Sequence, residues 1–208
     1  MTSNIYDVRS SVKRIAWGFF LIHMHFKIGP VDLLADWAGY ALIVSALAFV
    51  VGFEEDLKKL RPVGIFLLVW NVISWVGSIF GISGYLSYIA IIPAICNMYF
   101  IYKLFSELSD VAARYSCPQV SSLRVWGIAN VITTVISTAV SYLALIFSDV
   151  DIFMGAGLLL LPVGIIVMLG SMITLFRLSG ALKNVPDNSL PEIHIVDDVN
   201  PFGDGVTL

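Results

Sequence analysis

Side chains that could bind an ion or a polar substrate gather in two short acidic segments of this chain. Carboxylates with an imidazole nearby are ligands that cations prefer, so both segments are candidates for cation or substrate capture. Asp32 and Asp36 also precede an apolar run, where carboxylates stabilise the start of a helix by about 0.3–1 kcal/mol each. Structural anchoring is the favoured interpretation and capture is the alternative. The candidate outer-mouth set consists of His25, Lys27, Asp32, Asp36, Asp149 and Asp151.

Metal and cofactor chemistry are not indicated by the remaining reactive residues. His23 and His25 are two positions apart, so on one helix their side chains point about 200° away from each other. Cys96 lies in an apolar run and Cys117 in a polar loop, and neither has the spacing of a metal ligand. No nucleophile with an activating base and no Gly-rich phosphate loop is evident. We therefore expect no metal, no cofactor and no enzyme activity.

A seam of small polar residues is the second candidate site. Its members recur at steps of three and four, which places them on one face of a helix. Ser, Thr and Asn on such a face hydrogen-bond to neighbouring helices, and small side chains let helix backbones approach closely. Packing is the favoured interpretation, which also predicts that a large side chain at Gly164 overpacks the bundle, and the wall of a polar permeation path is the alternative. The seam consists of Asn130, Thr134, Ser137 and Ser141.

The composition shows what kind of element must position these residues. The chain has 208 residues, of which 58% are hydrophobic and only 13% charged. Its mean hydropathy is +0.89, whereas about a quarter of the residues of a soluble domain are charged. These values exclude a nucleic-acid-binding protein, a secreted disulfide scaffold and a disordered regulator. The sequence predicts an integral membrane protein.

Six apolar runs approach the roughly 20 residues that a membrane-spanning helix needs. They predict an all-α fold with a six-helix transmembrane bundle within residues 1–183. Residues 184–208 carry acids and prolines without Lys or Arg, which predicts a disordered acidic tail in the cytoplasm. The predicted spans are 12–27, 37–53, 63–82, 85–105, 125–147 and 152–176.

The positions of Lys and Arg predict the orientation of the bundle. Eleven of the 12 flank one side of the predicted spans, and only Lys27 falls on the other. By the positive-inside rule both termini are cytoplasmic, and the chain forms three hairpins. Leu104, Leu108 and Val111 continue an apolar stripe beyond the fourth span, while Glu107 is on another face. This pattern predicts a segment that lies along the membrane interface.

The outer turn resembles a signature of small multi-pass membrane proteins of Gram-positive bacteria. In that signature an acid-Phe-Arg-Ile turn is followed by Asp-Ile-Leu-Pro-Asp, two further residues and Gly-Tyr. In residues 25–40, His25 replaces the acid and Ala35 replaces the proline. The resemblance covers about the first 60 residues. It implies a bacterial plasma-membrane protein and carries no activity with it. The matching positions are Phe26, Ile28, Asp32, Leu34, Asp36, Gly39 and Tyr40.

Three functions remain open at this stage. The leading expectation is a non-enzymatic membrane component that is a structural or regulatory partner of another envelope protein. The second is a channel or uncoupled permease for a small solute, which would use the polar seam. The third and least favoured is an intramembrane enzyme. The expected partners are the lipid bilayer and either another membrane protein or a second copy of the chain, and no nucleic acid is expected.

Overall fold

The computed structural model describes residues 5–23, 27–28, 31–32, 36–50, 55–81, 89–147 and 150–185. These residues contain six α-helices, a two-stranded antiparallel hairpin and a short 3-10 helix. The hairpin pairs β1 (Lys27–Ile28) with β2 (Val31–Asp32), and η1 (Leu182–Asn184) follows the last α-helix. The α-helices are α1 (Ile5–His23), α2 (Asp36–Val50), α3 (Glu55–Ile79), α5 (Ile91–Arg114), α6 (Val120–Phe147) and α7 (Val150–Ala181).

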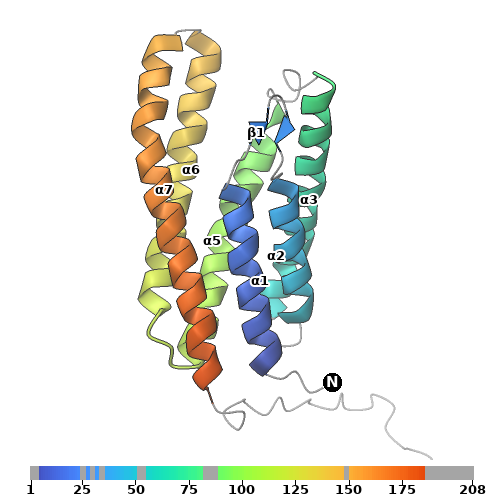
Figure 1. Ribbon diagram of the computed structural model, residues 1–208, viewed down its shortest axis with the longest axis vertical. Helices are drawn as coiled ribbons and strands as arrows, with labels where there is room; N and C mark the ends of the chain where they lie inside the picture. Colours follow the sequence, from blue (N-terminus) through green and yellow to red (C-terminus); the bar gives the residue numbers. More distant parts are fainter. Residues whose placement is uncertain are drawn as a thin grey trace, which may run out of the picture.

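The six helices form a bundle in which each helix packs against its neighbours in the sequence (Figure 1). α7 also packs against α1, so the order of the helices closes into a ring. Successive helices run in opposite directions, and the start of α1 and the end of α7 lie at the same end of the bundle. We call this end the basal end and the opposite end the distal end.

Three of the described helices are long and apolar enough to cross a membrane. These segments are Lys59–Ile79, Val120–Leu143 and Leu158–Asn184, and Asp36–Ala48 is a shorter apolar helix. Large apolar side chains cover the outside of the bundle, and Phe80 and Leu159 are both 75% exposed. A soluble protein rarely leaves apolar patches of this extent in water. The helices and their surface are consistent with an integral multi-pass membrane protein.

Helices α1 and α2 approach each other closely because glycine faces glycine at their crossing. A Cβ atom added to Gly18 would lie only 2.6 Å from the carbonyl oxygen of Gly39. The backbone of α2 therefore occupies the space that any larger residue at position 18 would need. Small residues at such crossings permit the close backbone contacts that hold helices together in lipid.

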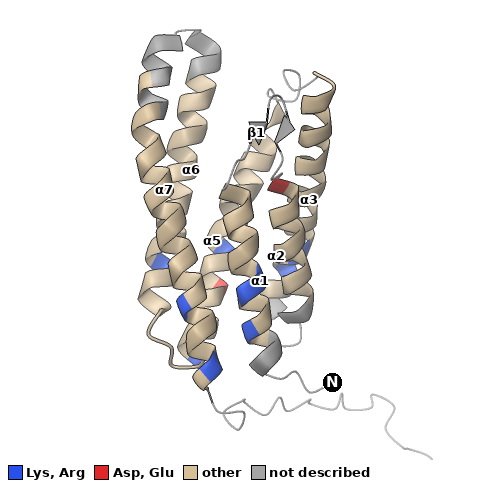
Figure 2. Cartoon of the chain, in the orientation of Figure 1, with Lys and Arg blue, Asp and Glu red and all other residues tan. Residues whose placement is uncertain are grey.

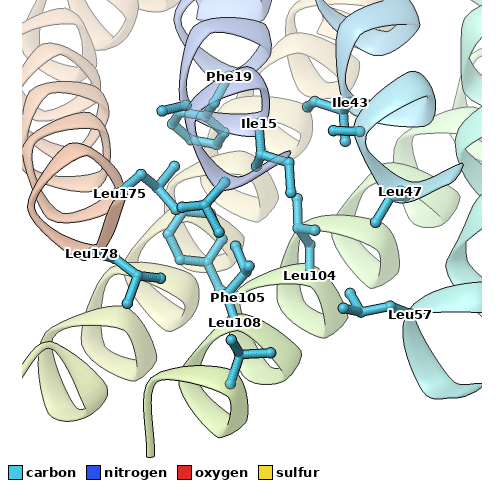
Figure 3. Packing of buried hydrophobic residues seen from close by; sticks show 14 of the residues in the cluster. Ile15, Phe19, Ile43, Leu47, Leu57, Leu104, Phe105, Leu108, Leu175 and Leu178 are labelled. Carbon is cyan, nitrogen blue, oxygen red and sulfur yellow. The ribbon is translucent and has the colours of Figure 1, made fainter. Parts of the chain in front are cut away.

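The best-packed part of the bundle lies toward the basal end (Figure 3). Ile15 of α1 and Leu104 of α5 are buried there beside side chains from α2, α3 and α7. Phe19 and Phe105 pack edge to face, with ring centroids 5.5 Å apart. Higher in the bundle, the hydroxyl of Tyr40 donates to Oδ1 of Asn97 at 2.7 Å, which links α2 to α5.

Charged side chains divide along the same axis. Among the helical residues that the structure describes, Lys and Arg gather in the basal half (Figure 2). The described cations include Arg14 of α1, Lys103 of α5, Arg124 of α6 and Arg177 of α7. The asymmetry that the sequence indicated is therefore also present along the axis of the bundle.

The ends of the helices differ from the predicted spans. α1 begins at Ile5 and ends at His23, so Lys27 lies in β1 and not at the end of the first span. α5 begins at Ile91, which puts Pro93 in its first turn, where a proline removes no helical hydrogen bond. The predicted tail beyond Val185 lies outside the described residues.

The segment predicted to lie along the membrane interface belongs to the bundle instead. α5 continues without a break to Arg114, and Leu104, Leu108 and Val111 are buried in the core. Glu107, expected on the polar face, is only 4% exposed and forms an ion pair with Lys103. An apolar stripe has the same spacing whether it faces lipid or other helices, so the sequence pattern could not separate the two.

Candidate functional site

A cavity of about 410 Å³ lies between α6, α7 and the end of α1. Most residues of the polar seam contribute to it, from the face of α6 that is turned toward α7. Leu161 and Ile165 are 58% and 47% exposed, so the cavity opens on the surface of the bundle. Its lining consists of His23, Asn130, Thr133, Thr134, Ser137, Thr138, Leu161, Gly164, Ile165, Val167 and Met168.

The cavity lies at the depth of the hydrocarbon core if the basal cations mark one membrane surface. At about 1.5 Å per residue, Asn130 and Thr138 are about 9 Å and about 21 Å along α6 from Arg124. Leu161 is about 24 Å along α7 from Arg177. In a core of about 30 Å, the cavity therefore extends from the basal half of the bilayer across its middle into its distal half.

One wall of the cavity offers hydrogen-bonding groups without a permanent charge. Within the described part of the chain, the hydroxyls of Thr133, Ser137 and Thr138 form no hydrogen bond. His23 completes this wall, and its Nδ1 atom donates to the carbonyl oxygen of Phe19 at 2.9 Å. Its ring packs on Phe19 with the centroids 4.2 Å apart, which fixes the imidazole at the end of α1.

The opposite wall is apolar and comes from α7. Val167 and Met168 lie next to Gly164, where an added Cβ would meet no atom within 4 Å. A first side-chain carbon at position 164 therefore meets open space, and the overpacking predicted for a large residue there is not supported by the structure. Gly164 leaves room for the cavity, whereas Gly170, two turns nearer the basal end, lies against the indole of Trp126.

A buried hydrogen bond closes the cavity on its basal side. Nδ2 of Asn130, which is 3% exposed, donates to Oγ of Ser171 at 2.7 Å and to the carbonyl oxygen of Trp126 at 2.8 Å. Ser171 in turn donates to the carbonyl oxygen of Val167 at 2.7 Å. Below this layer, Leu175 and Leu178 belong to the packed core. The polar lining therefore does not continue to the basal end.

The polar seam is thus divided among three environments. Asn130 lies at the base of the cavity, where it is buried and hydrogen-bonded to α7, Thr134 and Ser137 line the wall of the cavity, and Ser141 is exposed. The hydroxyl of Thr134 donates to the carbonyl oxygen of Asn130 at 2.8 Å, and that of Ser141 donates to the carbonyl oxygen of Ser137 at the same distance. The seam therefore includes a packed residue and a cavity wall, and the permeation path stays a prediction.

The outer-mouth set is described only in part. Lys27 and Asp32 are backbone partners in the register of the β1–β2 hairpin, and Asp36 is the first residue of α2. Asp151 lies in the first turn of α7, and its side chain is not described. His25 and Asp149 lie outside the described residues. In the described part of the chain, no group of three or more His, Cys, Asp or Glu residues is placed to hold a metal ion.

Three polar lining residues are absent from both candidate sets. His23 was considered only as a metal ligand beside His25, but α1 ends there and leaves it at the cavity wall. Thr133 and Thr138 are each adjacent in the sequence to a seam residue, Thr134 and Ser137. A search for residues spaced strictly by three and four positions therefore does not include them. A wider arc of Ser and Thr over 133–141 could have indicated that this face of α6 is broad and polar.

No protein-family model, no curated protein and no solved structure matches this chain.

Proposed function

We propose that this chain is a bacterial plasma-membrane protein that crosses the bilayer six times, with both termini in the cytoplasm, and that it acts by binding. The cations at the basal end support this orientation because Lys and Arg are retained on the cytoplasmic side. The resemblance of residues 25–40 to membrane proteins of Gram-positive bacteria supports the plasma membrane as the location.

The observation that carries the proposal is a hydroxyl-lined cavity that ends at the Asn130–Ser171 hydrogen bond. Hydroxyl and imidazole groups bind uncharged polar groups well, and they offer no counter-charge to an ion in a medium of low dielectric. The α7 wall is apolar. The ligand class that fits is therefore a small uncharged molecule with a polar edge and an apolar face.

The size of the cavity favours a small occupant. The stretch from Asn130 to Thr138 is about 12 Å long, and a volume of about 410 Å³ is in the range of small-molecule sites. The partner expected from the sequence, another membrane protein or a second copy, would bind elsewhere on the surface, and the chain would be a regulatory component that holds a small ligand.

An uncoupled permease is the second candidate, and the position of the cavity favours it. Hydroxyl groups extend from the middle of the bilayer toward the distal end, as an outward-open half-path would. Transport would require the Asn130–Ser171 layer and the core beneath it to open. The closed base makes binding the better-supported function.

A stability assay with matched probes tests the proposal. Purified full-length protein in detergent is titrated with cyclohexanol, which is uncharged, and with cyclohexanecarboxylate, which has the same ring and a charge. We expect cyclohexanol alone to raise the Tm, and Thr138→Val to weaken its binding about three- to tenfold through the loss of a hydrogen bond. Thr174→Val, outside the cavity, is the matched control and leaves binding unchanged.

Gly164→Leu places a bulky side chain in the cavity and separates specific binding from partition of the alcohol into detergent. The variant is expected to fold and to lose the Tm shift. An equal shift in the wild type and in this variant, or an equal shift with the carboxylate, would refute the proposed site. Release of trapped cyclohexanol-sized solutes from liposomes by the wild type would favour the permease.

A further inference from the structure

A second, smaller cavity of about 300 Å³ lies between α5 and α6 near the basal end. It is separate from the α6–α7 cavity and shares no lining residue with it. Its polar lining residues are Tyr102, Ser106 and Asp110 of α5 and Arg124 of α6. Nothing in the proposed function uses this cavity.

A buried hydrogen bond holds the ion pair of Arg124 and Asp110 in place. Nη2 of Arg124 lies 3.3 Å from Oδ1 of Asp110, and its Nε donates to Oγ of Ser109 at 3.1 Å. Ser109 is fully buried and donates to the carbonyl oxygen of Val120 at 3.2 Å. The guanidinium is therefore fixed by a neutral, buried anchor as well as by the carboxylate.

Both charged groups of the pair remain available to a ligand. The side chains of Arg124 and Asp110 are 61% and 48% exposed. A guanidinium has five N–H donors, of which these two contacts use two, and a carboxylate accepts several hydrogen bonds. Lys103 and Glu107, one turn away on α5, form an ion pair with each other. The cavity thus presents a cation and an anion side by side with no net charge.

The cavity lies where a phospholipid headgroup would reach it. Arg124 is near the start of the segment Val120–Leu143, which is long and apolar enough to cross a membrane. Tyr102 and Ile128, at its edge, are both 51% exposed, so the cavity opens sideways onto the apolar surface. Further from the basal end, Ile95, Tyr99 and Ile132 are also exposed and extend this apolar surface along α5 and α6.

We propose that this cavity binds the headgroup of an aminophospholipid of the cytoplasmic leaflet. The phosphate accepts hydrogen bonds from Arg124 and from the hydroxyls of Ser106 and Tyr102. The primary ammonium donates to the carboxylate of Asp110. A choline headgroup lacks N–H donors for this carboxylate, and a glycerol headgroup offers donors without a positive charge. A soluble phosphate ester shares the headgroup chemistry but cannot use the apolar surface.

Native mass spectrometry of delipidated full-length protein tests this proposal. The probes are phosphatidylethanolamine, phosphatidylcholine and phosphatidylglycerol with identical acyl chains, and free O-phosphoethanolamine. We expect phosphatidylethanolamine to bind about tenfold more tightly than the other two lipids, as a charge-assisted hydrogen bond implies. Binding of phosphatidylglycerol as tight as that of phosphatidylethanolamine would overturn the role of the ammonium. Binding of free phosphoethanolamine as tight as that of the lipid would overturn the lipid as occupant.

Two variants separate the roles of the charged groups. Asp110→Asn keeps the shape and is expected to remove the preference for ethanolamine over choline, while choline-lipid binding persists. Arg124→Gln is expected to weaken all three lipids at least tenfold. Arg177→Gln, an exposed cation on α7 outside this cavity, is the matched control and leaves the lipid preference unchanged. An unchanged preference in folded Asp110→Asn would also overturn the proposal, and its Tm establishes that it is folded.

Discussion

Asn130 of α6 donates its side-chain amide to the hydroxyl oxygen of Ser171 on α7, 2.7 Å away and 41 positions further along the chain. This bond marks the level at which the polar face of α6 changes its role. Toward the basal end the face is packed, and a Cβ at Gly127 would meet Phe105. Toward the distal end the same face lines the cavity.

The first prediction concerns the strength of this bond. Asn130→Ala and Ser171→Ala should each destabilise the protein by about 1 kcal/mol, because interhelical hydrogen bonds in membrane proteins contribute roughly 0.6–1.7 kcal/mol. The double variant should lose less than the sum of the two. Unfolding in a mixed detergent series measures these free energies. Ser141→Ala, at an exposed position, is the control and should be neutral; full additivity of Asn130→Ala and Ser171→Ala would mean that the bond does not form.

The second prediction concerns two glycines with opposite surroundings. Gly18→Ala places a methyl group 2.6 Å from the carbonyl oxygen of Gly39, so α1 and α2 must separate, at a cost of about 1–3 kcal/mol. Gly164→Ala enters open space, and alanine favours the helix, so its stability should equal or exceed that of the wild type. The same unfolding assay compares them. An equal loss of unfolding free energy at the two positions would contradict the open space beside Gly164.

The third prediction concerns the pH dependence of Cys117, in the connection between α5 and α6. Burial raises the pKa of its thiol above the ordinary value of 9.0. Because only the thiolate reacts, maleimide should label Cys117 in a Cys96→Ala background more slowly than a free thiol, with a rate that rises with pH. The neutral thiol is favoured in the folded state, so its stabilising contribution is present below pH 9 and is lost as the pH rises through the higher folded value.

A Cys117→Ala variant provides the control for this effect. Its stability should lack the component that the wild type loses above pH 9. Identical pH profiles of the two proteins, or labelling of Cys117 as fast as that of a free thiol at neutral pH, would show that the thiol is not buried.

The sequence was sufficient to predict the helical membrane class and the grouping of the cations, because both follow from composition and from positions along the chain. It did not predict that Glu107 is buried. An ion pair with Lys103 offsets the cost of burying the carboxylate, and the spacing of apolar residues along the chain contains no information on such a pair. The sequence also did not distinguish the part of the seam that is packed against α7 from the part that lines the cavity. Small side chains suit a close helix contact and the wall of a cavity equally well, as Gly127 and Gly164 illustrate.

The fourth prediction concerns the proposed orientation. Reporter fusions after residue 2 and after residue 184 should both be active only in the cytoplasm, and a fusion near Asp149 should report the exterior. The reason is that the described Lys and Arg residues gather in the basal half of the bundle, which the positive-inside rule assigns to the cytoplasm. A fusion at residue 184 that reports the exterior would contradict six membrane crossings.

We predict that water enters the cavity along the seam from the distal side and that it reaches no further than Asn130, and accessibility of single cysteines tests this most directly. Cys96 and Cys117 are first replaced by alanine, and a membrane-impermeant thiol reagent is added to the outside of intact cells. We predict labelling at Thr138→Cys and Ser137→Cys, and protection at Asn130→Cys, which lies in the closing layer. Val135→Cys, exposed on the apolar surface, is the control for lipid and should also be protected. Protection of the cysteines at positions 137 and 138 would mean that the seam is packed throughout. Labelling of the cysteine at position 130 would mean that the cavity is open at its basal side. Either result would contradict a cavity that ends at Asn130.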